Sequence, residues 1–378
     1  MKVQTINTPY GERYILLDND YKIIDEVKRF LKYLDVLSKS PNTLKNYAFH
    51  LKAFYEYMLI IDLDIKDLCN SPDKKPIDTL SNFILYLQYP DRFNGITHIG
   101  GEEAIRSDKT VNIIVDTVVE FYRYLSKNNE LEELDIYKMQ MANTQFKSFL
   151  YELISNKNSV KKHLLKKKVI EKELKYITRT QFTEMFNCCN LERDKLILAV
   201  LFEGGLRLNE VLGIHLEDLS EVDKGIIFIN PRENNENGAR VKNHASGKIK
   251  YPDYVIDMIL KYIETDVVNF DSDFLFLNLY GENKGKPMNA ITVEKLFNRL
   301  SEQIGYHVHP HMLRHGFATE KLESGMSLEE IAIHLRHKNV QSSQIYAHFT
   351  DELKKEKMRK FFDEKKLKYG GVISYDKE

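Results

Sequence analysis

Apolar residues recur at helical spacing through the first third of the chain. Three such runs cover residues 24–34, 47–58 and 111–125. Residues three and four apart lie on one face of a helix, so each run predicts an amphipathic helix that packs against its neighbours. Ser40 and Thr43 flank Pro41 just before the second run, a combination typical of a helix start. The pattern predicts a helical bundle over residues 20–150, after an N-terminal extension of residues 1–19.

The second half of the chain shows a change of period. Residues 225–229 are β-branched and aromatic, and residues 248–251 follow a long polar loop. Both segments have the composition of strands, so they predict a small hairpin. Helical periodicity predicts helices around it at residues 178–189, 193–203, 253–264, 290–304, 310–324, 327–336 and 341–349. The expected fold class is mainly α with a small β-hairpin.

Length and composition add a domain plan to this pattern. The chain has 378 residues, which exceeds the usual size of one domain, and its 43% hydrophobic content can bury a core. We expect a second domain over residues 176–350 and a basic linker over 151–175. Residues 351–378 would form an amphipathic tail helix.

Charge is balanced over the whole chain but is uneven along it. The 55 Lys and Arg residues oppose 56 Asp and Glu residues, for a net charge of -1, so any DNA-binding surface has to come from local clustering. Five lysines crowd the predicted linker: Lys161, Lys162, Lys166, Lys167 and Lys168. They are either a solvated face or contacts to DNA phosphates, and the sequence leaves both open.

Three cysteines in the whole chain favour a reducing compartment. Their number is odd and none stands in a CxxC pair, so no disulfide framework is expected. The first ten residues do not have the pattern of a signal peptide. The longest strongly apolar stretch, residues 196–202, is too short to span a bilayer. We expect a cytoplasmic protein with no membrane partner.

The segment His309-Pro310-His311-Met312-Leu313-Arg314-His315 carries the most chemistry. On a helix His311, Arg314 and His315 share one face, where a phosphate suits the planar fork of Arg and the proton-transferring His. Two other interpretations stay open. With His307 and His309 nearby, the cluster is a candidate zinc site, although no Cys or carboxylate stands in the local run. It also fits a structural ion-pair network.

Two further pieces stand on either side of this segment. Arg207 follows a Gly-Gly break after an apolar run, and Glu210 stands three residues later, where its carboxylate can orient the guanidinium. Tyr346 comes nine residues after His337. A free tyrosine has a pKa near ~10, so it acts as a nucleophile only beside cations or a base. As one of 22 tyrosines, Tyr346 taken alone is more simply a packing residue.

Taken in order, these residues resemble the tyrosine recombinase (phage integrase) family. The resemblance implies an N-terminal helical core-binding domain and a C-terminal catalytic domain with Arg, Lys, HxxRH, His or Trp, and Tyr. It implies that Arg207 and Arg314 clamp the scissile phosphate, that His311 moves a proton and that His337 binds the phosphate. Tyr346 would form a 3′-phosphotyrosyl link. Glu210 and His315 would support these groups.

The same resemblance implies a general-acid lysine in the hairpin loop. Lys242 is our first choice and Lys248 the second, because the long loop leaves the register open. Arg336 replaces the glycine usual before the equivalent of His337, which adds bulk and charge near the site. Ser40, Thr43 and Lys45, together with Lys161 and Lys162, are candidate DNA contacts.

The function expected is site-specific recombination for a mobile element, without metal, ATP or other cofactor; no GxxxxGK[ST] is present. Expected partners are double-stranded DNA with specific sites, further copies of the chain in a tetramer with the tail docked in trans, and accessory recombination proteins. Two alternatives are a type IB topoisomerase-like enzyme and a non-catalytic DNA-binding regulator. Relaxation of a plasmid without a specific site would favour the first, and specific binding without cleavage would favour the second.

Overall fold

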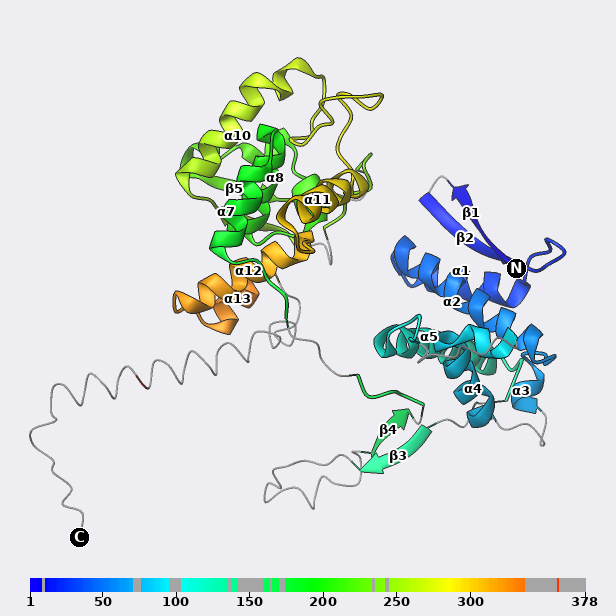
Figure 1. The fold of residues 1–378 in the computed structure, drawn as a ribbon. Coiled ribbons are helices and arrows are strands. Elements are labelled where there is room, and N and C mark those ends of the chain that lie inside the picture. The colour runs from blue at the N-terminus through cyan, green and yellow to red at the C-terminus, as the bar shows by residue number, and fades with distance from the viewer. Residues whose placement is uncertain are drawn as a thin grey trace, which may run out of the picture. The chain divides into compact units, whose positions relative to one another are not determined.

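The computed structural model shows a mainly helical chain in two compact units, Met1–Glu171 and Lys172–Glu378 (Figure 1). It describes residues 1–8, 11–70, 76–94, 103–132, 134, 137–141, 159–163, 165–169, 174–232, 235–241, 245–336 and 359. Within these ranges the strands pair as three separate antiparallel hairpins. No helix in the described part of the chain is long and apolar enough to cross a membrane.

The first unit is built from helices that bury one face each. Its elements are β1 (Lys2–Thr8), β2 (Gly11–Leu17), α1 (Asp25–Val36), α2 (Pro41–Ile60), α3 (Asp67–Asn70), α4 (Pro76–Gln88), η1 (Pro90–Asn94), α5 (Asp108–Lys127), β3 (Tyr137–Met141) and β4 (Ser159–His163). The three predicted apolar runs are the buried faces of α1, α2 and α5. Phe30, Phe54 and Phe121 meet in the shared core, which buries much of the apolar area that stabilises the bundle.

Several elements of the first unit were not predicted: the N-terminal hairpin, the helices α3, α4 and η1, and the pair β3–β4. The extension expected over residues 1–19 is a hairpin, in which Lys2 pairs with Leu17 and Thr8 with Gly11. β1 is largely exposed while β2 buries Leu16, so only one strand carries a clear apolar signal. Helix α4 was missed between two segments that contain turn-forming residues.

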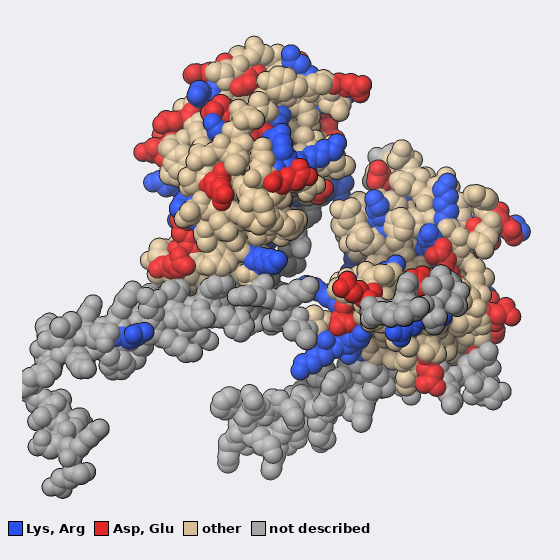
Figure 2. All heavy atoms as spheres, in the orientation of Figure 1, with Lys and Arg blue, Asp and Glu red and all other residues tan. Residues whose placement is uncertain are grey.

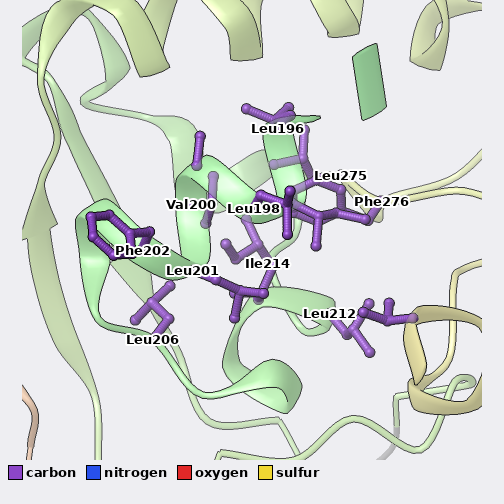
Figure 3. Packing of buried hydrophobic residues seen from close by; sticks show 14 of the residues in the cluster. Leu196, Leu198, Val200, Leu201, Phe202, Leu206, Leu212, Ile214, Leu275 and Phe276 are labelled. Atoms are coloured by element: carbon purple, nitrogen blue, oxygen red, sulfur yellow. The ribbon is translucent and has the colours of Figure 1, made fainter. Parts of the chain in front are cut away.

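The second unit surrounds one long buried helix. Its elements are α7 (Arg179–Cys188), α8 (Glu192–Gly204), α9 (Leu208–Leu212), η3 (Leu216–Leu219), η4 (Val222–Lys224), β5 (Ile226–Ile229), β6 (Gly247–Lys250), α10 (Asp253–Thr265), η6 (Val267–Asn269), α11 (Ala290–Ile304), α12 (Pro310–Glu323) and α13 (Leu328–His334). Residues 196–202 of α8 are fully buried, and Figure 3 shows Leu275 and Phe276 beside Leu198 of this helix. The apolar run that is too short for a membrane is thus the central core helix.

The predicted elements of the second unit are present with small shifts. Thr178 caps α7 by accepting from the backbone N–H of Gln181 at 3.3 Å. The hairpin pairs Ile226 with Lys250 and Ile229 with Gly247, one residue from the predicted bounds. The helix predicted over residues 327–336 ends at His334, because Arg336 has a positive φ of 53° that no α-helix accommodates. The predicted helix at 341–349 lies outside the described residues, as does the tail apart from Arg359.

Candidate active site

The turn between α8 and α9 sets the position of the predicted Arg–Glu pair. Gly205 ends α8 with φ +58°, a left-handed conformation that glycine adopts without steric cost. A Cβ at Gly205 would lie 2.5 Å from the ring of Phe317. The turn makes Arg207 the residue before the first turn of α9 and Glu210 its third helical residue. A tight, buried turn therefore aims both side chains.

Three arginines converge on the carboxylate of Glu210, whose side chain has no exposed area. Arg207 donates from Nη1 to Oε1 at 2.7 Å and from its backbone N–H to Oε2 at 2.9 Å. Arg336 donates from Nη2 to Oε2 at 2.6 Å. Nη1 of Arg314 lies 3.8 Å from that same oxygen. We call Arg207, Glu210, Arg314 and Arg336 the arginine cluster.

The arginine cluster keeps its buried carboxylate ionised. Burial alone would raise the pKa of Glu210, but the charge of Arg336 opposes this most strongly. The backbone N–H of Arg207 and the charges of Arg314 and Arg207 add to it, so the pKa of Glu210 is lowered below its usual value. Three guanidiniums and one carboxylate leave a formal excess of two positive charges, which suits an anionic ligand.

Arg314 ties three segments of the second unit together. Pro310 begins α12, and Arg314 lies one turn further on, almost fully buried. Its Nη1 donates to the backbone oxygen of Gly205 and its Nη2 to that of Leu335, both at 2.6 Å. The guanidinium is therefore fixed by the α8–α9 turn and by the end of α13. Such rigid placement is what a preorganised cationic site requires.

The open side of the arginine cluster is at Arg207. Its side chain is 18% exposed, against 4% for Arg314 and 7% for Arg336. His311, one turn before Arg314 on α12, is exposed, and its ring centroid lies 6.3 Å from that of half-buried His315. Within the arginine cluster, Arg207 is thus the most accessible to a ligand from solvent, and on α12 His311 is more exposed than His315.

The zinc alternative for the histidines finds no support in the described residues. No three His, Cys, Asp or Glu side chains there lie close enough to hold a metal ion. His307 and His309 continue the row, with centroids 5.8 Å apart, and His309 is 6.5 Å from His311. Burial, and then the charge of His307, lower the pKa of His309. The imidazoles follow one another along the chain and do not converge on a point.

The two candidate lysines are in different situations. Lys242 lies outside the described residues. Lys248 is in β6, where alternate side chains point to opposite faces. A Cβ at the preceding Gly247 would meet Arg336, whereas Lys248 is exposed, with Nζ 4.7 Å from the ring centre of Phe228 and 3.8 Å from Glu221. Lys248 thus points away from the arginine cluster.

Of the remaining predicted residues, His337 and Tyr346 lie outside the described residues, and so do the side chains of Lys161 and Lys162 on β4. In the first unit Ser40 caps α2 by accepting from the backbone N–H of Thr43 at 3.2 Å, and Lys45 is exposed on the first turn.

Two of the described linker lysines, Lys166 and Lys167, are paired with α5. Lys166 lies 3.1 Å from Asp116, and Lys167 lies 2.7 Å from Asp108. The carbonyl of Lys167 also accepts from Asn112 at 2.9 Å. These two lysines therefore hold the linker on the first unit. On the face drawn in Figure 2, basic and acidic side chains both occur on each unit.

Sequence reasoning missed one member of the arginine cluster. Arg336 was noted only as a bulky replacement, yet it makes the shortest of the cluster's bonds to Glu210. Its signal in the sequence was its place one residue before His337. Nothing in the pattern shows that its side chain returns to a carboxylate 126 residues earlier.

Comparison with known proteins gives consistent matches. The model of the phage integrase family matches residues 175–352. The chain is 34% identical over 380 residues to transposase A from transposon Tn554 of Staphylococcus aureus, covering 97% of this chain and 100% of that relative. It is 26% identical over 330 residues to the tyrosine recombinase XerA of Thermococcus onnurineus, covering 87% of this chain and 93% of that relative.

Solved structures show a similar fold at low sequence identity. The XerH site-specific recombinase, in a post-cleavage complex with its difH substrate, matches with a TM-score of 0.58 at 18% identity, over 88% of this chain and 83% of that one. The integrase of transposon Tn1549, in complex with transposon right end DNA, matches with a TM-score of 0.56 at 17% identity, over 89% and 98%.

Proposed function

This chain belongs to the phage integrase family of tyrosine recombinases, and we propose that it moves a mobile element by cutting and rejoining DNA at specific sites. The observation that carries the proposal is the convergence of Arg207 and Arg314 on buried Glu210. Arg207 precedes α9 and Arg314 lies on α12, far apart in the sequence, and the carboxylate holds them within one cationic site. The likeness to a transposase along the whole chain supports the mobile-element role.

The arginine cluster would bind the scissile phosphate. Phosphoryl transfer builds negative charge on the equatorial oxygens, and fixed guanidiniums stabilise that charge without having to reorganise. Arg207, which is the most exposed of the three, would contact one non-bridging oxygen. Arg314, fixed by two carbonyls, would contact another. His315 would support this pair from the same face of α12.

Tyr346 would attack the phosphorus and form a 3′-phosphotyrosyl link while the bond to the 5′-oxygen breaks. The phenol proton would pass to His311, and Lys242 would give a proton to the leaving 5′-oxygen. His337 would hydrogen-bond a phosphate oxygen. The orientation of Lys248 away from the arginine cluster supports the choice of Lys242. Attack on the link by a 5′-hydroxyl from a second site would rejoin the strands, so the link stores the bond energy.

Recombination needs two DNA sites, so we propose that four copies assemble on them and that each tail, residues 351–378, docks on a neighbouring copy. Accessory recombination proteins would set the direction. In the first unit the capped start of α2, with Ser40, Thr43 and Lys45, would contact DNA phosphates. Lys161 and Lys162 would add charge there.

A nicked suicide substrate tests the proposal. Duplexes made from the DNA that flanks the gene, nicked so that the 5′-hydroxyl fragment diffuses away, should trap the wild-type protein on a DNA 3′ end. Tyr346→Phe should form no adduct. Tyr280→Phe, which changes an exposed tyrosine of the same unit, should react like the wild type. An adduct formed by Tyr346→Phe, or specific binding with no cleavage by the wild type, would contradict the proposal.

A further inference from the structure

Arg336 has a backbone conformation that its residue type disfavours. It follows the end of α13 with φ +53°, where a Cβ crowds the neighbouring carbonyl and Gly or Asn is usual. The other non-glycine residues with positive φ in the described ranges all lie in the first unit, and they are Tyr21, Ser38, Asp62 and Asn129. The turn itself does not require an arginine. The contacts of the Arg336 side chain must therefore explain why an arginine is present at this position.

The side chain of Arg336 fits into a prepared space. Its Nη1 donates to the carbonyl of His334 at 3.2 Å, and its Nη2 reaches Glu210 at 2.6 Å. Its aliphatic part passes over Gly247 of β6, where an added Cβ would come within 2.7 Å of Cδ. A strained backbone and a glycine on another element thus accommodate one nearly buried guanidinium.

The contacts of Glu210 show what this guanidinium does there. Oε1 accepts from the side chain of Arg207, while Oε2 accepts from the backbone of Arg207 and from Arg336. Nη1 of Arg314 stays 3.8 Å from Oε2, beyond hydrogen-bond distance. Arg336 is thus the closer guanidinium to that oxygen, while the guanidinium of Arg314 donates to the carbonyls of Gly205 and Leu335.

We propose that Arg336 is a positioning residue for strand cleavage, which acts through Glu210 to hold Arg207 in line and to keep that carboxylate from pairing closely with Arg314. The inference rests on the proposed function. Arg336 need not touch the DNA. It sets where the carboxylate lies and therefore how much positive charge the other two arginines present to the phosphate.

Two substitutions separate this role from a purely structural one. Arg336→Gly removes the guanidinium and also relieves the backbone strain, so a residue that only shaped the turn would be replaced without loss. Arg336→Lys keeps a cation on the strained backbone. Tyr21→Gly is the matched control, since it relieves a similar φ of 61° at an exposed position of the first unit.

We expect Arg336→Gly to cleave the suicide substrate up to about 10²-fold more slowly in single turnover, since small misplacements of a reacting group have effects of this size. Arg336→Lys should recover part of the rate, and Tyr21→Gly should cleave like the wild type.

The acid limb of the pH–rate profile should move to higher pH in Arg336→Gly. Among the described residues, the groups that face Glu210 besides Arg336 are Arg207, Arg314 and the buried phenol of Tyr251. Wild-type rate and pH profile in Arg336→Gly would overturn the proposal.

A second measurement does not depend on finding the DNA site. In thermal unfolding, Arg336→Gly, Glu210→Gln and the double variant form a mutant cycle. The changes in Tm should be clearly non-additive if the two side chains act as a pair. Additive changes would overturn the positioning role. If the wild type cleaves none of the DNA tested, the proposed function is contradicted, while the cycle still decides whether Arg336 holds Glu210.

Discussion

Two buried carboxylates of the second unit, Glu210 and Asp218, make the same backbone contact in different electrostatic surroundings. Each is the third residue of a short helical turn and is about 1% exposed. Each accepts from the backbone N–H of the residue that precedes its turn, Arg207 or His215, at 2.9 Å. Local sequence therefore places both in the same way, and the backbone motif does not distinguish them.

Their side-chain partners do distinguish them. Asp218 accepts from Arg232 at 2.7 and 2.8 Å and from the amide of Asn230 at 2.7 Å. Arg232 also donates to Glu217 at 2.6 Å, so one guanidinium stands between two carboxylates. Among the described residues, Asp218 is therefore satisfied by protein groups, with no excess of cations around it.

Glu210 is surrounded by three guanidiniums. This excess of buried cations is energetically unfavourable unless a bound anion compensates for it. Like charges repel, and burying them without compensation is unfavourable. Perturbed charge clusters are more frequent at functional sites for this reason. The ratio of cations to anions around a buried carboxylate therefore separates a reactive site from a structural one. Substitution of matched residues in the two clusters tests this distinction.

The largest effect is expected from Arg207→Ala. Loss of one preorganised cation from a charge-stabilising site costs about 10²–10³ in rate, or ~3–4 kcal/mol of transition-state stabilisation. Arg207 is the most exposed of the three arginines, so the fold should survive with a small change in Tm. The measurement is the single-turnover rate of adduct formation on the nicked substrate, together with a thermal melt.

Arg232→Ala is the matched substitution at Asp218. It leaves a buried carboxylate without its cation, which should lower the free energy of unfolding by about 3 kcal/mol. Protein that remains folded should cleave at nearly the wild-type rate. If Arg207→Ala lost stability and kept its rate, or if Arg232→Ala lost its rate while still folded, the distinction between the two clusters would fail.

A smaller effect is expected from Gly205→Ala, which tests the turn that aims Arg207. A Cβ there enters the ring of Phe317, and the φ of +58° disfavours any side chain. Strain of this kind and overpacking together should lower the free energy of unfolding by about 2–4 kcal/mol. Chemical denaturation measures the change.

Gly238→Ala supplies the control, because it has a φ of +72° with nothing within 4 Å of its Cβ. The free energy of unfolding of Gly238→Ala should fall only by the conformational contribution, about 1–2 kcal/mol. Equal losses in the two variants would mean that the contact with Phe317 does not restrict the turn.

The sequence predicts well those features that local physics determines. The runs at 24–34 and 111–125 became buried helix faces, and Thr178 caps α7 because capping needs only a short range of residues. The Gly-Gly break predicted the turn before α9, since Gly205 adopts a conformation that few residues accept. In the same way, the spacing from 311 to 315 placed one row of charged groups on α12.

Contacts between distant segments could not be predicted in this way. No rule of spacing links Arg336 to Glu210 or brings its side chain over Gly247, because these approaches depend on how α9, α13 and β6 pack together. The linker lysines illustrate the same limit. The sequence leaves Lys167 either on a solvated face or at DNA phosphates, and it does not predict the ion pair with Asp108 that tertiary packing forms. The N-terminal hairpin was missed because β1 buries almost nothing.

The smallest effect concerns pH, and it is measured as a difference between the wild type and Glu210→Gln. Although burial opposes ionisation, the charges of Arg336, Arg314 and Arg207 lower the pKa of Glu210 below its usual value of 4.5. A carboxyl whose pKa is lowered in the folded state stabilises the protein at pH values above its pKa in the unfolded state. That contribution is lost as the pH falls through the pKa of the folded state.

The difference in unfolding free energy between the wild type and Glu210→Gln should therefore be constant from about pH 8 to pH 5. Below about pH 4.5, the usual pKa of a glutamate, this difference should narrow as Glu210 takes up its proton. Glu217→Gln, at an exposed carboxylate, should differ little from the wild type throughout. A difference that already narrows between pH 7 and 5 would mean that the three guanidiniums do not act on Glu210 together, and the contrast with Asp218 would lose its physical basis.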